Sequence, residues 1–559
     1  MLRAAAALEG HAGQRSIDVH QLIGVNVDQF FGIEIEEFPA QIAQVALWLV
    51  DHQMNLRVSE EFGQYFARIP LVTSPRIVHG NALTLDWNEV LPAAQCSFVL
   101  GNPPFSGKHY QSKQQKADAL SVYDGVKSVS DLDLVAAWFV KAAKYIQGHD
   151  VRCAFVATNS LTQGEQVPLL WPLLFERFAI RIHFAHRTFQ WRNEARGVAA
   201  VHCVIVGFAC SEPSKRRLFE YETPKSKPHE LEVSNINAYL LDGPNVIVTK
   251  HSSPISPRPG MGCGSKPSDG GHLILDSDEK AELLGTEPQA AEYIKPFVGS
   301  QEFLNGGDRW CLWLEGASPS VLKQLPSVLE RLQKVRKFRL KSTAEPTRRA
   351  ASTPGRFFFV AQPASEYLAI PEVSSERRTY VPIGYLSPDV IASNKLYIIE
   401  KPNLYVMGLL QSSMHAVWMR TVGGRLESRI QYSGTMVYNT FPWPFDAAQD
   451  SESNPLPVPV QQARAAIESA AQGVLDARAQ FAGSSLADLY DPLTMPPALL
   501  KAHQRLDAAV DKAYQLAGGP KSYQNDAERV AFLFTLYQRI TSLLPAAQAP
   551  RRTARRKPA

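Results

Sequence analysis

The chain has 559 residues, of which 45% are hydrophobic and 20% are charged, a balance typical of globular proteins that excludes a largely disordered chain. No stretch approaches the roughly 20 consecutive apolar residues of a membrane span, and the N-terminal MLRAAAALEG lacks the apolar core of a secretory signal. We therefore expect a cytoplasmic protein with no membrane partner. The net charge of +4 does not by itself identify a nucleic-acid-binding protein, and the six widely separated cysteines argue against a zinc site, so no metal is expected.

Short apolar runs alternate with amphipathic segments from residue 29 to about 208. The strand-like runs are QFFGIEI, RIVHGNAL, SFVLGNPPF, RCAFVATNS, IRIHFAH and VHCVIVGF, and the helix-like ones include FPAQIAQVALWLVDH and LDLVAAWFVKAAKYI. This order predicts an α/β fold with a largely parallel sheet. Between about 210 and 270 the composition changes to Pro, Ser, Lys and Gly, and we place the end of a first domain at residue 245.

Three further regions follow the first domain. Residues 246–446 mix short strand-like runs with helical pieces, which predicts an α+β domain. Residues 447–545 show apolar residues at helical spacing in three segments and predict a helical domain. Residues 546–559 are too basic and too poor in apolar residues to pack, so we expect a disordered tail.

The tetrapeptide Asn102-Pro103-Pro104-Phe105 directly follows a predicted strand, at the end where open α/β sheets bind ligands. A plain turn is the alternative, because Asn and Pro are common turn residues. The chemistry favours an exocyclic amine as substrate, since the Asn102 side-chain oxygen and the Pro103 carbonyl can accept its hydrogens from a rigid loop. Phe105 can stack on a base flipped out of a duplex. The sequence contains no Pro-Cys pair, which argues against methylation at cytosine C5 through a cysteine nucleophile.

With these residues in place, the chain resembles the MmeI-like (type IIL) restriction-modification enzymes. The stretches that carry the resemblance are FFGIEIEEFPAQIAQVALWLVDHQMN, VLGNPPFSGK, ATNSLTQGEQV, AHRTFQWRNEARGVAAVHCVIVGF, YNTFPWPF and SLADLYDPLTMPPALLKAH. The resemblance implies a Rossmann-like methyltransferase domain, then a target-recognition domain and a C-terminal helical domain. It also implies transfer of a methyl group from S-adenosylmethionine to adenine N6 in a specific sequence of double-stranded DNA.

The resemblance also implies roles for single residues. Glu34 matches the acid that binds the ribose hydroxyls of the cofactor, and Asn81 with Ala82 matches the position that contacts its adenine. The tetrapeptide matches the catalytic motif, in which Phe105 stacks on the target base. Phe189 and Trp191 lie where the family has a second aromatic near that base. The alternatives are a solvated acid at a helix N-terminus for Glu34 and ordinary core packing for the two aromatics.

One feature of the family is missing from this sequence. The family begins its methyltransferase fold with a strand and a D-P-A-C-G-S-G-N-F type loop, and nothing upstream of Phe30 fits that pattern. We therefore expect a fold that lacks its first strand and loop, with a separate chain as one source of the missing part. A catalytically inactive DNA-binding remnant of such an enzyme is the alternative function.

Two groups of residues are candidates for DNA recognition in the second domain. Residues 330–350 are densely basic, and Arg336, Lys337 and Arg339 suit contacts with phosphates, although a solvated helix face is the alternative. Glu376 and Arg378 combine side chains that can distinguish cytosine and guanine edges in the major groove.

Overall fold

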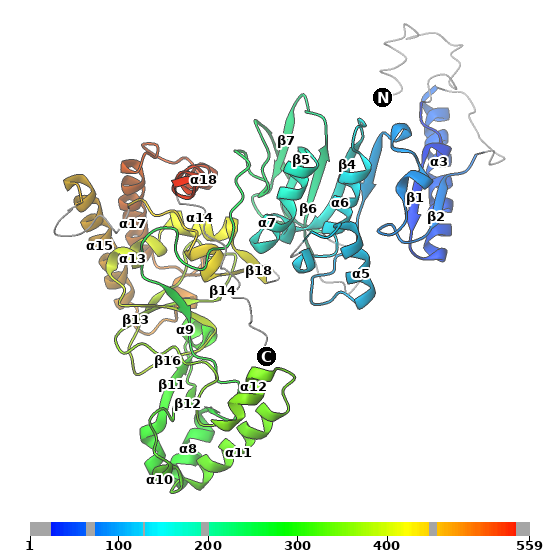
Figure 1. The fold of residues 1–559 in the computed structure, drawn as a ribbon. Coiled ribbons are helices and arrows are strands. Elements are labelled where there is room, and N and C mark those ends of the chain that lie inside the picture. The colour runs from blue at the N-terminus through cyan, green and yellow to red at the C-terminus, as the bar shows by residue number, and fades with distance from the viewer. Residues whose placement is uncertain are drawn as a thin grey trace, which may run out of the picture. The chain divides into compact units, whose positions relative to one another are not determined.

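The computed structural model describes residues 24–62, 73–126, 129–191, 201–426, 428–445 and 456–543. The N-terminal MLRAAAALEG and the basic tail at 546–559 lie outside these described residues. Contacts divide the chain into two compact units, residues 1–161 with 169–233 and residues 162–168 with 234–559 (Figure 1). In the part of the chain that is described, no helix has the length and apolar character needed to span a membrane.

The first unit is built on a six-stranded sheet with the order β3-β4-β6-β5-β7-β8. Its strands are β3 (Phe98–Gly101), β4 (Arg152–Thr158), β5 (Arg181–Trp191), β6 (Val201–Ala209), β7 (Arg216–Glu220) and β8 (His229–Val233). β3 pairs in parallel with β4, and β5 with β7, whereas β6 runs antiparallel to both β4 and β5. The sheet is therefore mixed, not largely parallel, because β6 and β8 run in the opposite direction.

Aromatic packing fixes the core of this sheet. Helix α6 (Ala136–Tyr145) has apolar residues on one face, and the ring of its Phe139 lies 5.3 Å from that of Phe155 in β4 and 5.5 Å from that of Phe208 in β6. All three side chains are at most 2% exposed. Helix α5 (Lys113–Val122) packs beside α6, and Ser112 begins it through a capping box with Gln115.

A second, two-stranded sheet precedes β3 in the chain. β1 (Phe31–Glu34) pairs in parallel with β2 (Arg76–His79), and helix α3 (Glu37–Phe62) connects them. Within the described residues, β1 has no strand partner besides β2, and β3 has none besides β4. Phe98 and Leu100, which lie on the same face of β3, are 64% and 76% exposed.

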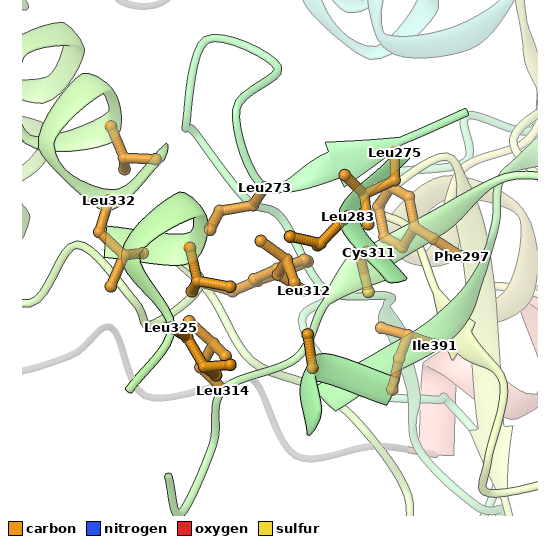
Figure 2. Close-up of a cluster of buried hydrophobic side chains, with 14 residues drawn as sticks. Leu273, Leu275, Leu283, Phe297, Cys311, Leu312, Leu314, Leu325, Leu332 and Ile391 are labelled. Carbon is orange, nitrogen blue, oxygen red and sulfur yellow. The ribbon is translucent and has the colours of Figure 1, made fainter. Parts of the chain in front are cut away.

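The second unit contains three small sheets and most of the helices. One sheet has the order β10-β12-β11-β16, another β15-β13-β17-β9, and the third β14-β19-β18. Their strands are β9 (Met261–Cys263), β10 (Ile274–Leu275), β11 (Ile294–Val298), β12 (Trp310–Leu312), β13 (Tyr367–Pro371), β14 (Val373–Ser374), β15 (Gly384–Leu386), β16 (Ile391–Ala392), β17 (Leu396–Glu400), β18 (Gly424–Leu426) and β19 (Arg429–Gln431). Figure 2 shows the buried cluster that joins the first of these sheets to its helices, with Leu273, Leu312 and Leu325 among its side chains.

Helices complete the second unit. The longer ones are α8 (Ser277–Thr286), α11 (Pro326–Leu340), α13 (Leu404–Leu410), α14 (Ser413–Val422), α15 (Val458–Ala479), α17 (Pro497–Leu516) and α18 (Asp526–Leu543). The shorter helices of the chain are α4 (Trp87–Val90), α7 (Val167–Pro172), α9 (Ser300–Asn305), α10 (Pro319–Leu322), α12 (Glu345–Arg349) and α16 (Leu486–Leu489). Asp507 of α17 accepts hydrogen bonds of 2.7 Å from the Tyr380 hydroxyl and from both the backbone N–H and the hydroxyl of Ser413. The C-terminal helices thus belong to the same compact unit as the sheets before them.

Candidate active site

The candidate tetrapeptide Asn102-Pro103-Pro104-Phe105 begins where β3 ends. Gly101 is the last residue of β3 and the register partner of Phe155 in β4. A Cβ atom at position 101 would lie 3.1 Å from two ring carbons of Phe155, so only glycine fits here without displacing the core. Beyond it, Pro103 is buried and Asn102 is exposed. The buried proline anchors the turn, and the Asn102 amide is accessible to a ligand.

The direction of the strands brings several candidate residues to one edge of the sheet. β4 and β5 both run antiparallel to β6, so they point the same way, and β3 and β7 are parallel to them. The residues at the C-terminal ends of these four strands are the tetrapeptide after β3, Ser160 after β4, Phe189 and Trp191 in β5, and Tyr221 after β7. This edge is where ligands bind in open α/β sheets.

The loop after the tetrapeptide is tied to the segment that leads into α6. The Ser106 carbonyl accepts hydrogen bonds from the Leu134 N–H at 2.9 Å and from the Gln111 side chain at 3.2 Å. The same Gln111 amide donates to the Leu132 carbonyl at 3.0 Å. These bonds fix the loop from both sides and so restrict the motion of Phe105, which is half-buried.

Asp133 connects this segment to the end of β4. Its Oδ2 accepts hydrogen bonds from the hydroxyls of Ser160 and of Thr158, the latter at 3.3 Å, and its Oδ1 lies beside Gly107. A carboxylate with these partners holds the ends of neighbouring strands in a fixed relation. Asp133 was not among the predicted site residues, because an acid before a helix has no distinctive pattern. Its only signal in the sequence is its position directly before the apolar run LVAAWF.

Phe189 and Trp191 belong to a partly exposed aromatic cluster. The Phe189 ring stacks on Tyr221 with centroids 5.5 Å apart and planes at 22°, and lies 6.1 Å from Trp191. The Tyr221 hydroxyl and His186 Nδ1 are hydrogen-bonded at 2.8 Å, and burial lowers the pKa of His186. Trp191 is 42% exposed, so it is not part of the core. Tyr221 is a member of the cluster that the sequence pattern did not identify.

The candidate cofactor residues lie at the ends of the two parallel strands of the small sheet. Glu34 is the last residue of β1, and its Oε1 accepts from the N–H groups of Ile35 at 2.9 Å and Glu36 at 3.4 Å. These bonds fix the orientation of the carboxylate at the strand end, whose oxygens can accept hydroxyl hydrogens. This position and charge fit a group that offers vicinal hydroxyls.

Asn81 and Ala82 follow β2 in a turn. The Asn81 side chain accepts from the Leu83 N–H at 3.0 Å and donates to Asp118 of α5 at 2.8 Å. The Ala82 carbonyl accepts from the Trp87 indole at 2.9 Å. One Asn81 hydrogen is therefore committed to Asp118, and this bond fixes the orientation of its amide.

The structure corrects the expectation for Arg339. Its side chain is fully buried and donates to five backbone carbonyls, those of Pro267, Ser268, Ala350, Thr353 and Arg356. It therefore holds α11 to two loops and is not accessible to a phosphate. Arg336 and Lys337 of the same helix are exposed.

The Glu376 and Arg378 pair lies in the turn after β14. Glu376 is exposed, whereas Arg378 is half-buried and donates from Nη1 to the Ser374 hydroxyl at 3.3 Å. Burial lowers the pKa of Arg378, and Asp491 opposes that change. Burial lowers the pKa of Arg425 to about 10, and the nearby Glu376 opposes that change.

The candidate residues do not form a metal site in the described part of the chain. Among the residues that the structure describes, no group of three or more His, Cys, Asp or Glu could hold a metal ion. A cavity of about 470 Å³ lies elsewhere, beside Arg309 in the second unit, with Asp276, Glu279 and Glu302 in its lining.

Comparisons with known proteins match nearly the whole chain. Three family models match in succession: the DNA-methyltransferase domain of MmeI at residues 3–220, its target recognition domain at 242–445 and its C-terminal domain at 459–545. DNA methyltransferase A of Bacillus subtilis (strain 168) is 39% identical over 521 residues, which are 92% of this chain and 56% of that protein. The chain thus spans little more than half the length of that curated relative.

A solved structure is also similar to this one. It is that of the Type IIL restriction-modification enzyme MmeI in complex with DNA, which is 53% identical with a TM-score of 0.84. The match covers 97% of this chain and 70% of the MmeI chain.

Proposed function

The chain belongs to the MmeI family of restriction-modification enzymes, and on that premise we propose that it methylates adenine N6 in a specific sequence of double-stranded DNA. The observation that carries the proposal is the position of Asn102 and Phe105 at the C-terminal edge of the sheet, directly after Gly101. The biological setting is host DNA marking in restriction-modification, and the methyl donor is S-adenosylmethionine.

The chemistry of the proposed reaction depends on the amine of the target base. When bound, S-adenosylmethionine supplies an activated methyl group. The Asn102 side-chain oxygen and the Pro103 carbonyl accept the two hydrogens of the amine, which raises the availability of its lone pair. Because Pro103 is buried, the backbone of the turn that carries both acceptors is held in place. Phe105 stacks on the flipped base and offsets part of the cost of unstacking it.

The proposed cofactor contacts are those of Glu34, Asn81 and Ala82. The Glu34 carboxylate would accept the ribose hydroxyls, and the turn at Asn81 and Ala82 would contact the adenine. Both positions follow parallel strands that are register partners, Glu34 opposite His79. Replacement of Glu34 by Gln is expected to weaken binding of S-adenosylmethionine, measured by calorimetric titration, without changing affinity for DNA.

We also propose that one more strand completes the sheet between β1 and β3. Each of the two has only one paired edge within the described residues, and β3 exposes the apolar side chains of Phe98 and Leu100 on one face. A separate chain would supply this strand. Hydrogen exchange tests it: the amides of β3 that point to the free edge should exchange fast in this chain alone and slowly once the strand is added.

The test of the proposed function is methyl transfer to DNA by the chain and its variants. We expect labelled methyl groups to appear as N6-methyladenine in digested DNA, and Asn102→Ala or Phe105→Ala to abolish transfer without lowering the unfolding temperature. Asn305→Ala, an exposed asparagine at the end of α9, is the matched control and should keep full activity. Methylated cytosine, or wild-type rates in the Asn102 variant, would overturn the assignment. DNA binding without any transfer would indicate the inactive remnant instead.

A further inference from the structure

We infer that residues 106–112, the loop after the catalytic tetrapeptide, form a second contact with the DNA strand that carries the target adenine, in which Tyr110 stacks on a neighbouring nucleotide. The inference rests on the proposed function. It adds an interaction surface and a specific stacking residue that the tetrapeptide does not include.

Tyr110 is the first observation. Its side chain is 88% exposed, more than any other large apolar side chain of the described residues. An aromatic ring of this size is normally buried or placed at an interface, since tyrosine combines a large apolar face with a polar tip. Tyr110 therefore has the exposure of a residue that meets a partner.

The second observation is that the loop is rigid where it presents the ring. The Tyr110 N–H donates to the Gly107 carbonyl at 2.9 Å, which closes a turn. Gln111 is hydrogen-bonded to Ser106, and Lys108 forms a 3.3 Å ion pair with Asp131. A ring on a fixed turn loses little conformational freedom when it binds, so its stacking energy is largely retained.

The third observation is the charge around the ring. Lys108 is paired with Asp131, whereas Lys113 and Lys116 are exposed and supply the positive charge of residues 102–117. Such a stretch is complementary to a phosphate backbone. Single-stranded nucleic acid is bound by this combination of positive charge and aromatic platforms.

The chain length between the two aromatics limits which nucleotide Tyr110 can reach. Tyr110 lies five residues after Phe105, a span of at most about 18 Å even if fully extended. Successive bases along one strand are about 3.4 Å apart. The partner of Tyr110 is therefore a nucleotide within a few positions of the flipped adenine and not a distant part of the duplex.

The test measures DNA affinity by fluorescence anisotropy, with two duplexes of the same sequence. In one the adenines are fully paired, and in the other a central adenine lies opposite an abasic position and is unpaired. We expect Tyr110→Ala to weaken binding of the second duplex roughly 5- to 150-fold, the fold-change that corresponds to one base–aromatic stack. Tyr110→Phe keeps the ring and should bind within about twofold of wild type, whereas Tyr110→Leu should lose as much as alanine.

Leu493→Ala is the matched control, since Leu493 is 82% exposed elsewhere on the chain. It should bind like the wild type. Wild-type affinity of Tyr110→Ala, or equal losses in Tyr110→Phe and Tyr110→Ala, would overturn the inference while leaving the proposed function intact. If the wild-type chain binds neither duplex, the proposed function itself is contradicted.

Discussion

Gly101 lies directly against the ring of Phe155, with an ideal Cβ position 3.1 Å from its Cδ1 and Cε1 atoms. The Phe155 ring cannot move away, because Phe139 and Phe208 surround it at centroid distances of 5.3 and 5.9 Å. The strand that leads into Asn102 thus packs directly against the aromatic core of the sheet. This contact relates the packing of the sheet to the position of the turn at Asn102.

Gly101→Ala should therefore both destabilise the first unit and impair catalysis. We expect a loss of about 1 to 3 kcal/mol in the free energy of unfolding, as for other overpacked sites, together with a lower rate of methyl transfer. Denaturant unfolding and single-turnover kinetics measure the two effects. Gly473→Ala, in helix α15 with no atom near its Cβ position, is the matched control and should stabilise by about 0.5 to 1 kcal/mol. A stable, fully active Gly101→Ala variant would contradict the packing argument.

Arg339 and its neighbours on α11 should behave in opposite ways. Arg339→Met leaves five buried carbonyls without their donor and is expected to cost about 2 to 5 kcal/mol of stability. Replacing the exposed Arg336 and Lys337 by alanine should leave stability nearly unchanged. That double replacement should instead lower the slope of log affinity against log salt by about 0.9 for each phosphate that is no longer neutralised. An unchanged salt slope would show that neither residue binds the DNA backbone.

Two buried histidines predict how stability depends on pH. Burial lowers the pKa of His415 and of His503 to about 3, and both rings are hydrogen-bonded to tyrosine hydroxyls at 2.9 Å. In the unfolded chain a histidine takes up a proton below about pH 6.5, so each stabilises the fold above that pH and loses this contribution as the pH falls. As the pH falls from roughly 6 to 4, we expect each histidine to lower the free energy of unfolding by about 1.4 kcal/mol per pH unit.

Denaturant midpoints measured from pH 7 to pH 4 test this dependence. His415→Gln and His503→Gln should each remove about one proton from the difference in protons bound by the unfolded and folded states, and the double variant about two. Asp507 acts in the opposite direction. Burial raises its pKa, so its contribution to the stability of the fold is lost as the pH rises. Comparing each variant with the wild type cancels that contribution. A wild-type slope in both single variants would show that these histidines do not control the acid sensitivity.

Local sequence patterns predicted the end of the strand before Asn102 but not the residues that support the turn that follows. The apolar run SFVLG predicted a strand ending before Asn102, and the structure ends β3 at Gly101. The burial of Arg339 also had a signal, since it continues the spacing of the buried Val328, Leu332 and Val335 along one helix face. The expectation that Arg339 contacts phosphate was wrong, because it rested on the charge of the side chain and not on its position along the helix.

Other features depend on contacts between distant parts of the chain and have no local signal. Asp133 meets Ser160 across 27 residues, and Asp507 meets Ser413 across 94. The antiparallel direction of β6 is likewise set by its pairing with β5. Its apolar residues resemble those of a parallel strand, so the local sequence does not indicate this direction. The presentation of Tyr110 depends on Gln111 reaching Leu132, which its sequence neighbourhood does not indicate.

The last prediction concerns recognition of bases by the turn after β14. A side chain that distinguishes bases must hold a fixed orientation, and Arg378 is held by Ser374 and by its partial burial, whereas its neighbour Arg377 is exposed. Arg378→Ala should therefore relax discrimination at one base pair by about 1 to 3 kcal/mol, and Glu376→Ala should do the same if its carboxylate accepts from a cytosine amine. Arg377→Ala, the matched control, should weaken binding to all sequences equally, as expected for a side chain that binds phosphate.

The two roles separate in one experiment, in which affinities are measured for a panel of single-base variants of the methylated site at several salt concentrations. Removing a side chain that reads a base changes the ranking of the panel and leaves the salt slope of each member almost the same, because no phosphate is released. Removing a side chain that binds phosphate keeps the ranking and flattens the slope. If Glu376→Ala and Arg378→Ala both keep the wild-type ranking, neither residue reads a base. In that case the partial burial of Arg378 serves only the packing of the turn, in which Ser374 holds it.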